Sequence, residues 1–479
     1  MEAHLRARHL VVGSGAGGAV TAAYLAEAGE DVLVLEEGGA VSHGTFPQFS
    51  LEQVEHQYRD RGMTTMYGNY LTNYAEGCCV GGSTEVNSGL YHLPDAATLA
   101  AWSARFAISD LSEQSLAAAA ADVEETIGLT DGAEWGSEGA TARLHDGARV
   151  LGWSVQAVPR WAHREPSGST VWHGMSSTFL PRAERAGARL LPDSRVERIE
   201  SAGGRVTGAA ARHPDGTLFS IEAEEVWCCA GAIGSPALLQ RSGIGDLRGA
   251  LSAHPTVKAV ARFPEDLGPF DDVPVHQVKE FGPSITLGGS ARSPSQVALA
   301  LAAELPEAAA FLDQPGHAGV YYAAVSPSGN RGRITTPRGA HGGSVPLLWV
   351  SRDDRALLAA GLRRLCHLLL AAGAIEIRVG IPGIGAIRGA GDLCRLPDRL
   401  PLSASLMTVH TFSSLPMGEL PGRCPIDSFG NLKGWSGLHV NDASIIPSAP
   451  GINPQGTVMA LAARNVAGFL SASGGSASS

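Results

Sequence analysis

Near its start the chain carries a glycine-rich loop between a short apolar run and an alanine-rich segment. The run 9–12 has the length of a strand, and the loop places Gly13, Ser14, Gly15 and Gly18 in the spacing Gly-x-Gly-x-x-Gly. The first glycine permits a tight turn, the second lets a phosphate approach the backbone, and the third lets a helix pack against the strand. Free N–H groups and the helix dipole favour an anion at that helix N-terminus. The sequence therefore predicts an α/β unit that binds a dinucleotide.

An acidic residue follows the second predicted strand of this unit. Residues 18–28 are expected to form a helix that Gly29 ends, and residues 31–35 a strand with Glu36 after it. Glu36 lies 21 residues after Gly15. A carboxylate at this spacing accepts hydrogen bonds from ribose hydroxyl groups and repels a 2′-phosphate. FAD or NAD is therefore favoured as the cofactor, and NADP is disfavoured.

Composition and charge exclude several classes of protein. The 479 residues are 44% hydrophobic and 17% charged, which is enough apolar matter for a large core spread over two or three domains. The net charge of −11 argues against a nucleic-acid partner. No apolar run reaches the roughly 18–20 residues of a membrane span. The N-terminus shows no apolar segment of a signal peptide, so a cytoplasmic location is expected.

The cysteines predict neither a metal site nor a disulfide framework. Their number is odd, and no Cys-x-x-Cys pair occurs among Cys78, Cys79, Cys228, Cys229, Cys366, Cys394 and Cys424. We expect all of them to be free. A dithiol flavoprotein reductase would need a cysteine pair soon after Glu36, and residues 37–77 contain no cysteine.

The rest of the chain gives coarser expectations of local structure. Residues 95–150 and 353–374 read as helical, and residues 189–226 as strands with turns at 203–204 and 215–216. Residues 263–296 read as a long loop or lid and residues 381–400 as irregular structure, because both are rich in turn-forming residues. A last helix is expected from Pro454 through Val466, followed by a disordered tail at 471–479.

Three further segments decide between FAD and NAD. They are 77–89, with Gly81, Gly82, Ser83 and Asn87; 226–244, with Ala230; and 409–470, with His410, Asp442 and Asn453. Together with the first loop, they resemble the glucose–methanol–choline (GMC) oxidoreductases, which use FAD. The resemblance extends over nearly the whole chain, and it is most specific in these segments and loosest in the expected substrate domain.

The resemblance implies an α/β fold with two interleaved parts. A Rossmann-like FAD-binding domain would comprise residues 1–92, 175–255 and 400–470. A substrate-binding domain built on an antiparallel sheet would comprise residues 93–174 and 256–399.

The resemblance also implies which residues contact FAD. They are Gly13, Ser14, Gly15, Gly18, Glu36, Gly81, Gly82, Ser83, Asn87, Val196, Ala230, Asp442, Ala443, Asn453, Pro454 and Gln455. Asn87 is expected beside the isoalloxazine, and Asp442 at the ribityl or phosphate groups unless it is only a helix-capping carboxylate. Some members link the flavin to a histidine just before this asparagine. Val86 occupies that position here, so non-covalent FAD is expected.

The catalytic expectation concerns the C-terminal segment. Oxidising an alcohol with a flavin requires a base for the hydroxyl proton, and histidine has a suitable pKa. The resemblance implies that His410 is this base and that Asn453 holds the substrate oxygen, as in the His/Asn type of the family. The positive end of the last helix would then face the flavin N1/C2=O edge. His439, between apolar residues of a predicted strand, is expected to be structural.

The expected activity is oxidation of a small-molecule alcohol, with oxygen or another carrier reoxidising the flavin. Segment 264–313 is rich in acidic residues, namely Glu265, Asp266, Asp271, Asp272, Glu280, Glu304, Glu307 and Asp313, against Lys279 and Arg292. An acidic lid would favour a cationic substrate such as an amino sugar, of the aminoglycoside type found in natural-product biosynthesis; a solvated acidic surface is the plainer interpretation. Alternatives are a sterol or long-chain alcohol, a non-redox lyase or decarboxylase of the same fold, a flavin-binding protein without catalysis, and an NAD-dependent dehydrogenase.

Overall fold

A seven-stranded sheet is assembled from segments far apart in the sequence. Its order is β8-β2-β1-β11-β10-β9, with β22 paired to β11. The strands are β1 (His4–Val12), β2 (Val32–Leu35), β8 (Arg189–Leu191), β9 (Arg195–Ala202), β10 (Arg205–Arg212), β11 (Leu218–Cys228) and β22 (Leu438–Val440). Strands β8, β2, β1, β11 and β22 pair in parallel, whereas β9 and β10 are antiparallel. The strands and turns predicted for residues 189–226 are confirmed.

Helices cover both faces of this sheet, which explains why its central strands are continuous apolar runs. Leu10 and Val12 contribute to the core on one face, together with α3 (Ala96–Phe106). Val11 points to the other face, because successive strand residues alternate. That face is covered by α1 (Ala16–Glu27), α4 (Glu113–Thr126), α6 (Phe179–Arg185) and α11 (Gln455–Ser476). The structure is a computed structural model that describes residues 4–41, 44–135, 139–166, 170–245, 247, 251–268, 270, 276–302, 309–327, 331–336 and 343–476.

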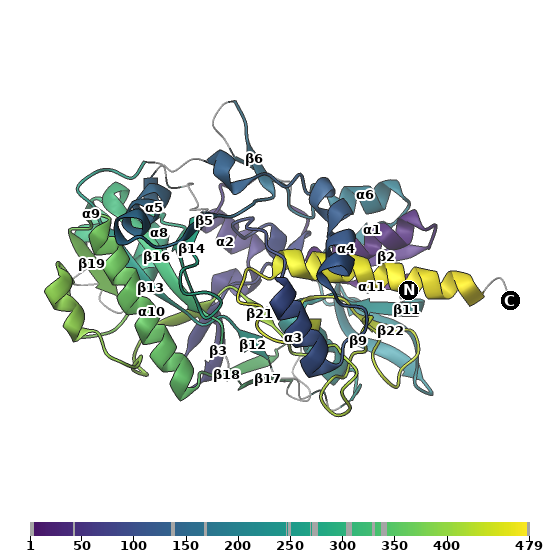
Figure 1. The fold of residues 1–479 in the computed structure, drawn as a ribbon. Coiled ribbons are helices and arrows are strands. Elements are labelled where there is room, and N and C mark those ends of the chain that lie inside the picture. The colour runs from purple at the N-terminus through teal and green to yellow at the C-terminus, as the bar shows by residue number, and fades with distance from the viewer. Residues whose placement is uncertain are drawn as a thin grey trace.

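A second sheet of eleven strands lies beside the first (Figure 1). Its order is β17-β18-β3-β4-β20-β13-β16-β15-β14-β5, with β19 paired to β13. The strands are β3 (Thr64–Gly68), β4 (Thr72–Tyr74), β5 (Val155–Ala157), β13 (Thr256–Arg262), β14 (His276–Val278), β15 (Ile285–Ser290), β16 (Ala318–Val325), β17 (Arg331–Thr335), β18 (Val345–Trp349), β19 (Glu376–Val379) and β20 (Leu406–Thr408). All pairs are antiparallel except β18 with β3 and β20 with β4. Helices α5 (Gly139–Leu151) and α10 (Arg352–Ala371) bury one face of its central strands.

Strand pairing and helix packing cross the expected division into two domains, and one predicted loop is wrong in part. Strands β3, β4 and β20 lie within segments assigned to the FAD-binding domain, yet they pair in the second sheet. Helices α3 and α4, assigned to the substrate domain, pack against the first sheet instead. The predicted loop at 263–296 is wrong in part, because it contains β14, β15 and the start of α8 (Pro294–Ala300); residues 269 and 271–275 lie outside the described residues.

The last helix is longer than the sequence suggests. Helix α11 continues ten residues past Val466 to Ser476, so residues 471–476 are helical rather than a disordered tail; residues 477–479 lie outside the described part. It begins between the two sheets and runs along the first one to the C-terminal end (Figure 1). Within the described ranges, every helix is too short or too polar to cross a lipid bilayer.

Candidate functional site

The first glycine loop connects β1 to α1 and leaves open space at its second glycine. A Cβ atom on Gly18 would lie 1.9 Å from the carbonyl oxygen of Gly13, so close packing of the helix on the loop requires this glycine. A Cβ atom on Gly15 would meet only the Cα of Gly82, at 3.9 Å. No protein contact therefore requires Gly15, and the space beside it at the α1 N-terminus suits a phosphate group.

The carboxylate of Glu36 ties this loop to the end of β2. One of its oxygens accepts hydrogen bonds from the backbone N–H (2.9 Å) and the hydroxyl (2.7 Å) of Ser14, and the other accepts from the N–H of Gly38 (2.9 Å). Burial raises the pKa of Glu36, and these three donors oppose the increase. Each carboxylate oxygen has further lone pairs, so Glu36 retains capacity to accept from ribose hydroxyl groups.

The second glycine loop lies directly on the first. The N–H of Gly81 donates to the Ser14 hydroxyl (3.0 Å). Gly82 has a φ of +57°, and a Cβ atom there would lie 2.9 Å from the Cα of Gly15, so a side chain is excluded on both counts. The Ser83 hydroxyl accepts from the N–H of Gly77 (3.0 Å) and thus stabilises its own loop.

Asn87 links this loop to the start of α11. Its amide nitrogen donates to the side-chain oxygen of Gln455, and its own oxygen accepts from the N–H of Gly89 (2.8 Å). The carbonyl oxygen of Pro454 accepts from the N–H of Val458 (2.9 Å), which places Pro454 at the helix N-terminus, as predicted. The positive end of α11 therefore lies beside Asn87.

Buried polar atoms without partners gather at the same helix end. They are Nε2 of Gln455, Oγ1 of Thr457 and both ring nitrogens of His92, none of which has a hydrogen-bond partner among the described residues. The His92 backbone lies against the helix, because a Cβ atom on Gly456 would be 2.6 Å from its carbonyl oxygen. Such groups are costly to bury unless a ligand satisfies them. These residues fit FAD: the loop at the α1 end would hold its phosphates, and the unpartnered groups at the α11 end would hold its ring system. No sequence motif indicated His92 or Thr457.

Asp442 is a capping residue in this structure. Its buried carboxylate accepts from the N–H of Ser444 (2.8 Å) and of Gly231 (2.9 Å) and from the hydroxyl of Ser235 (2.5 Å). It thereby joins the turn at Ala443–Ile445 to the start of α7 (Gly231–Arg241). The carboxylate thus holds two elements of the protein together, and the backbone is a further group that this position can offer to a cofactor.

The remaining predicted cofactor residues have small or apolar side chains. Ala230 is the residue before α7, and its N–H donates to the Ser235 hydroxyl (3.0 Å). Ala443 follows the Asp442 cap, and Val196 is buried within β9. Backbone groups are therefore what these positions can offer to a ligand.

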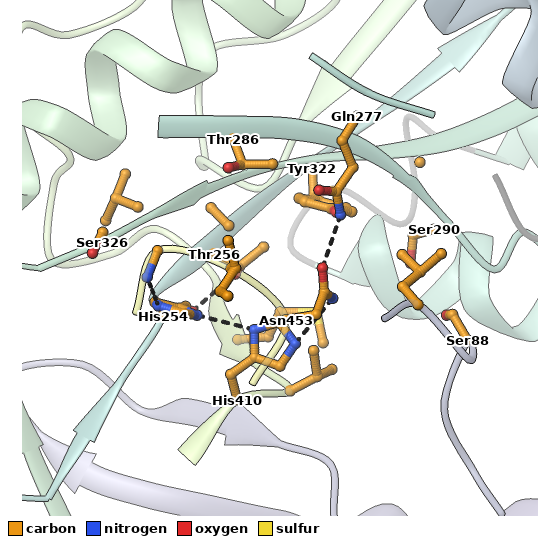
Figure 2. A pocket seen from close by; sticks show the side chains of 18 of the residues that line it. Ser88, His254, Thr256, Gln277, Thr286, Ser290, Tyr322, Ser326, His410 and Asn453 are labelled. Atoms are coloured by element: carbon orange, nitrogen blue, oxygen red, sulfur yellow. Dashed lines mark hydrogen bonds between the residues drawn. The ribbon is translucent and has the colours of Figure 1, made fainter. Parts of the chain in front are cut away.

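His410 and Asn453, 43 residues apart in the sequence, meet at the end of the second sheet (Figure 2). The side-chain nitrogen of Asn453 lies 3.3 Å from Nε2 of His410. His410 lies between β20 and β21 (Thr411–Phe412), and Asn453 lies just before α11. The structure thus brings together the two residues predicted to be catalytic.

A second histidine, which the sequence did not indicate, contacts His410. Nδ1 of His254 lies 3.0 Å from Nδ1 of His410. His254 lies between β12 (Ser252–Ala253), which pairs with β21, and β13, which pairs with β20. These two strand pairings bring the connections that carry His254 and His410 together. Only the tertiary structure determines the pairings.

The contact between the two Nδ1 atoms couples the tautomers of the histidines. Only one proton fits between the two Nδ1 atoms. When His410 carries that proton, its Nε2 has a free lone pair toward Asn453 and is able to accept a proton. The N–H of Gly451 lies 3.3 Å from Nε2 of His254 and favours the opposite tautomer, in which His254 donates to His410. The tautomer of His410 therefore depends on His254.

Asn453 is held from the other side by the second sheet. The side-chain nitrogen of Gln277, on β14, lies 3.1 Å from the Asn453 oxygen and 3.1 Å from the hydroxyl of Tyr322, on β16. The labelled side chains of Figure 2 show this line from Tyr322 through Asn453 to His254. Gln277 and Tyr322 therefore fix the Asn453 amide in front of His410.

Burial keeps the histidine pair neutral. It lowers the pKa of His410 to about 4, with a further contribution from the positive charge of Lys279. The pKa of His254 is also lowered, first by burial and then by His410 and Lys279. At neutral pH the pair carries no net charge, so a lone pair is available for a proton.

The histidines line a cavity of about 820 Å³, its open mouth included. The lining is partly apolar, with Leu90, Pro283, Val325, Met407 and Ile452, and otherwise polar, with hydroxyl and amide groups and two lysines, Lys258 and Lys279. None of its described residues is acidic. A cavity with this mixture of apolar and polar groups suits a small organic molecule.

The acidic lid expected over this cavity is not found among the described residues. Glu265, Asp266, Glu280 and Asp313 do not line the cavity, and Glu280 instead accepts a hydrogen bond from the N–H of Ser154 (3.0 Å). The remaining four, Asp271, Asp272, Glu304 and Glu307, lie outside the described residues. The expectation rested on interpreting this segment as a lid of the substrate domain, and composition alone does not show which side chains of a segment reach a cavity.

Other candidate groups are structural. All seven cysteines are free, and His439 is held by Glu225 (2.8 Å) and Asn431 (2.8 Å), as expected for a structural residue. In the part of the chain that the structure describes, no group of three or more His, Cys, Asp or Glu side chains is arranged to hold a metal ion.

Comparison with known proteins gives the family. Residues 8–256 and 329–462 match the GMC oxidoreductase family. The chain is 34% identical to the GMC-type oxidoreductase y4nJ of Sinorhizobium fredii over 98% of this chain and 96% of that protein. It is 26% identical to the long-chain-alcohol oxidase FAO4B of Arabidopsis thaliana over 96% of this chain and 66% of that protein.

Solved structures show the same fold. Pyridoxine 4-oxidase from Mesorbium loti superposes with a TM-score of 0.72 at 19% identity, covering 97% of this chain and 99% of that one. Formate oxidase from Aspergillus oryzae gives 0.75 at 16% identity, covering 98% of each chain. The chain belongs to the GMC oxidoreductase family and is an FAD-dependent oxidoreductase.

Proposed function

We propose that the protein oxidises the CH–OH group of a small-molecule alcohol to an aldehyde or ketone, with His410 as the general base and FAD bound non-covalently. The observation that carries this proposal is the contact of His410 with Asn453 in the wall of a cavity. The relationship to long-chain-alcohol oxidases supports the same reaction class. Val86, in the position before Asn87, offers no nucleophile for covalent attachment of the flavin there.

Each residue of the site has a separate role in the proposed reaction. FAD, when bound, supplies the acceptor for the hydride that leaves the carbinol carbon. Nε2 of His410 takes the hydroxyl proton, and the Asn453 amide holds the substrate oxygen in line with it. The positive charge of Lys279 disfavours the imidazolium and favours the negative charge that develops on the substrate oxygen. The N-terminus of α11 favours negative charge on a nearby ring system.

Two substrate classes follow from the sequence, and the lining of the cavity supports one of them better than the other. An amino sugar was suggested by acidic residues that, where described, do not line the cavity. A long-chain or sterol-like alcohol agrees with the apolar part of the lining and with the long-chain-alcohol oxidases among the relatives. We therefore favour an alcohol with an apolar body over an amino sugar.

A spectroscopic experiment tests the proposed reaction. The FAD-loaded protein, mixed anaerobically with 1-octanol, 8-hydroxyoctanoate, a sterol, glucose or an amino sugar, should lose its absorbance near 450 nm with at least one alcohol. Admitting air then distinguishes oxygen from another carrier as the electron acceptor. If no alcohol in the panel bleaches the flavin, the proposal is contradicted. Cleavage of a cyanohydrin or decarboxylation of a fatty acid by the same protein would then identify it as a lyase or a decarboxylase.

The acid limb of the pH profile is a second expected result. Because the pKa of His410 is lowered to about 4, kcat/KM for 1-octanol should stay high down to about pH 5 and fall as His410 is protonated near pH 4. The ordinary value of about 6.5 would place this limb more than two pH units higher. Lys279→Met removes a positive charge near His410 and should shift the limb to higher pH.

The charged and titratable groups facing His410 in the described residues are His254, His92 and Lys279. Lys433→Met changes a lysine outside the cavity and should leave the limb unchanged. An acid limb near pH 6.5 in the unmodified protein would show that burial does not control this histidine.

A further inference from the structure

We propose that the alcohol oxidised by this protein carries an anionic group, a carboxylate or a phosphate, that Lys258 binds in the cavity, with Lys279 adding positive charge nearer the reacting end. This inference rests on the proposed alcohol oxidation and adds the charge of the substrate. It replaces the cationic substrate expected from the sequence.

The two lysines lie on the sheet that forms the cavity wall. On β13, Val257, Ala259 and Ala261 face α10 and the core, so Thr256 and Lys258 point to the opposite, cavity side. The register of the sheet aligns Lys258 with Tyr322 and Gly288, and Gly288 with Gln277, in one row across β13, β16, β15 and β14. The row therefore runs from Lys258 to the side chain that holds Asn453.

Lys279 approaches the catalytic end of the same face. It is the residue after β14, and its ammonium group lies 3.5 Å from the hydroxyl of Thr286. Thr286 is aligned with Ala324 and, through it, with Thr256, two residues from His254. The charge of Lys279 is close enough to lower the pKa of both His410 and His254. One cation thus lies near the reacting end and the other farther along β13.

No described residue neutralises these two charges. Lys258 makes no hydrogen bond or ion pair with the residues that the structure describes, and Lys279 has only the long contact with Thr286. The described lining of the cavity contains two lysines and no aspartate or glutamate. Burial lowers the pKa of each lysine to about 8, so both remain mostly cationic at neutral pH. Two lysines enclosed in the cavity without an opposite charge destabilise the site unless a bound anion compensates their positive charge.

The position of these lysines is unusual for the chain as a whole. The protein has 36 basic residues but only three lysines, Lys258, Lys279 and Lys433, and its net charge is −11. Two of the three therefore lie in one cavity of an acidic protein that otherwise uses arginine. The third, Lys433, has the ordinary arrangement of a structural lysine, with an ion pair to Glu419 at 3.2 Å and a hydrogen bond to the carbonyl of Gly418.

The spacing indicates the kind of molecule to test. Lys258 follows His254 by four residues, about 13 Å at roughly 3.3 Å per residue of strand. Apolar side chains line the cavity as well. A hydroxy acid with a medium-length apolar chain matches this arrangement, with its hydroxyl group at His410 and its anion at Lys258, while Lys279 adds positive charge nearer the hydroxyl group.

The experiment compares probes that differ only in the charge at one end. Octanoate, octyl phosphate, 1-octanol and octylamine are titrated into the FAD-loaded protein by calorimetry, and 8-hydroxyoctanoate, 1-octanol and 8-amino-1-octanol are compared as substrates by kcat/KM. We expect the anions to bind roughly 10- to 100-fold more tightly than 1-octanol and octylamine to bind most weakly. The better of octanoate and octyl phosphate identifies the anion. The same order is expected for kcat/KM of the hydroxy compounds.

Three variants assign the effect to the lysines. Lys258→Gln should reduce the preference for the anion roughly tenfold or more, whereas Lys258→Arg should retain most of it because the charge remains. Lys433→Gln is the matched change outside the cavity and should leave the preference unaltered. Flavin absorbance and Tm show that each variant is folded and loaded with FAD. If Lys258→Gln does not fold or bind FAD, Lys258→Arg and the series of charged probes still test the inference.

The outcomes separate this inference from the proposed function. If 1-octanol and 8-amino-1-octanol bleach the flavin as well as the hydroxy acid, the protein is an alcohol oxidoreductase and the anionic substrate is wrong. If no alcohol bleaches the flavin but octanoate or octyl phosphate binds tightly through Lys258, the cavity binds anions and the proposed oxidation fails. Equal binding of octanoate and octylamine would overturn the inference by itself.

Discussion

Replacing His410 with alanine should lower the rate at which an alcohol substrate reduces the flavin by roughly 10²- to 10⁴-fold. The substitution removes the imidazole whose Nε2 lies 3.3 Å from the side-chain nitrogen of Asn453 in the wall of the cavity. The residues that fit FAD lie at the glycine loops and the α11 N-terminus, so FAD content should be unchanged. Stopped-flow absorbance near 450 nm under anaerobic conditions measures the rate, and the spectrum of the purified protein measures the content.

A matched histidine variant controls for this result. His367 lies on the exposed surface of α10, and His367→Ala should reduce flavin at the unmodified rate. If His410→Ala retains full activity with FAD bound, another group removes the hydroxyl proton, and the role assigned to His410 is wrong. If it loses FAD as well, the residue contributes to the cofactor site rather than to proton transfer alone.

Replacing Glu36 with alanine should weaken FAD binding by roughly 10- to 100-fold. The carboxylate accepts three hydrogen bonds, two from Ser14 and one from the N–H of Gly38. Its loss leaves buried donors in the first glycine loop unsatisfied, each costing about 1–3 kcal/mol, and removes the acceptor proposed for the ribose hydroxyl groups. Flavin fluorescence during titration of the apoprotein with FAD gives the change in Kd.

Glu36→Gln and Glu37→Ala provide the comparison. The glutamine keeps one oxygen acceptor, so the Kd of Glu36→Gln for FAD should lie between the values of the unmodified protein and Glu36→Ala. Glu37 pairs with Arg59 (3.0 Å) and Arg195 (3.4 Å) rather than with the glycine loop, so its removal should affect FAD binding much less. An unchanged Kd in Glu36→Ala would remove Glu36 from the cofactor site.

Much of the cofactor unit follows from local sequence patterns. The strand, loop, helix and strand at residues 4–35 are encoded within about 30 residues, so periodicity and glycine spacing suffice to predict them. The same holds for the helix that begins after Pro454 and for the strands between 195 and 228. Asp442 shows the limit of such patterns, because a motif position does not reveal that its carboxylate caps Ala443–Ile445 and α7.

The substrate side depends on long-range pairing instead. The segment 263–296 has the composition of a loop, yet β14 and β15 form in it because β16 and β5 provide hydrogen-bonding partners on either side. Strands β3, β4 and β20 cross the predicted division into domains for the same reason, since they join the second sheet only through contacts with distant strands.

The sequence by itself determined the family resemblance and the cofactor class, because these depend on motifs of residue types at fixed spacings. It also predicted the pair His410 and Asn453, from the two C-terminal segments that carry the resemblance. The tertiary structure alone decided that His254 contacts His410 and that Lys258 and Lys279 face the cavity. Those contacts arise from the register of β13 with its neighbours and from which face of the strand is buried. A charge in the sequence cannot be assigned to a site until the fold shows which side chains point into it. Here the described acidic residues of segment 264–313 lie outside the cavity, whereas Lys258 and Lys279 line it.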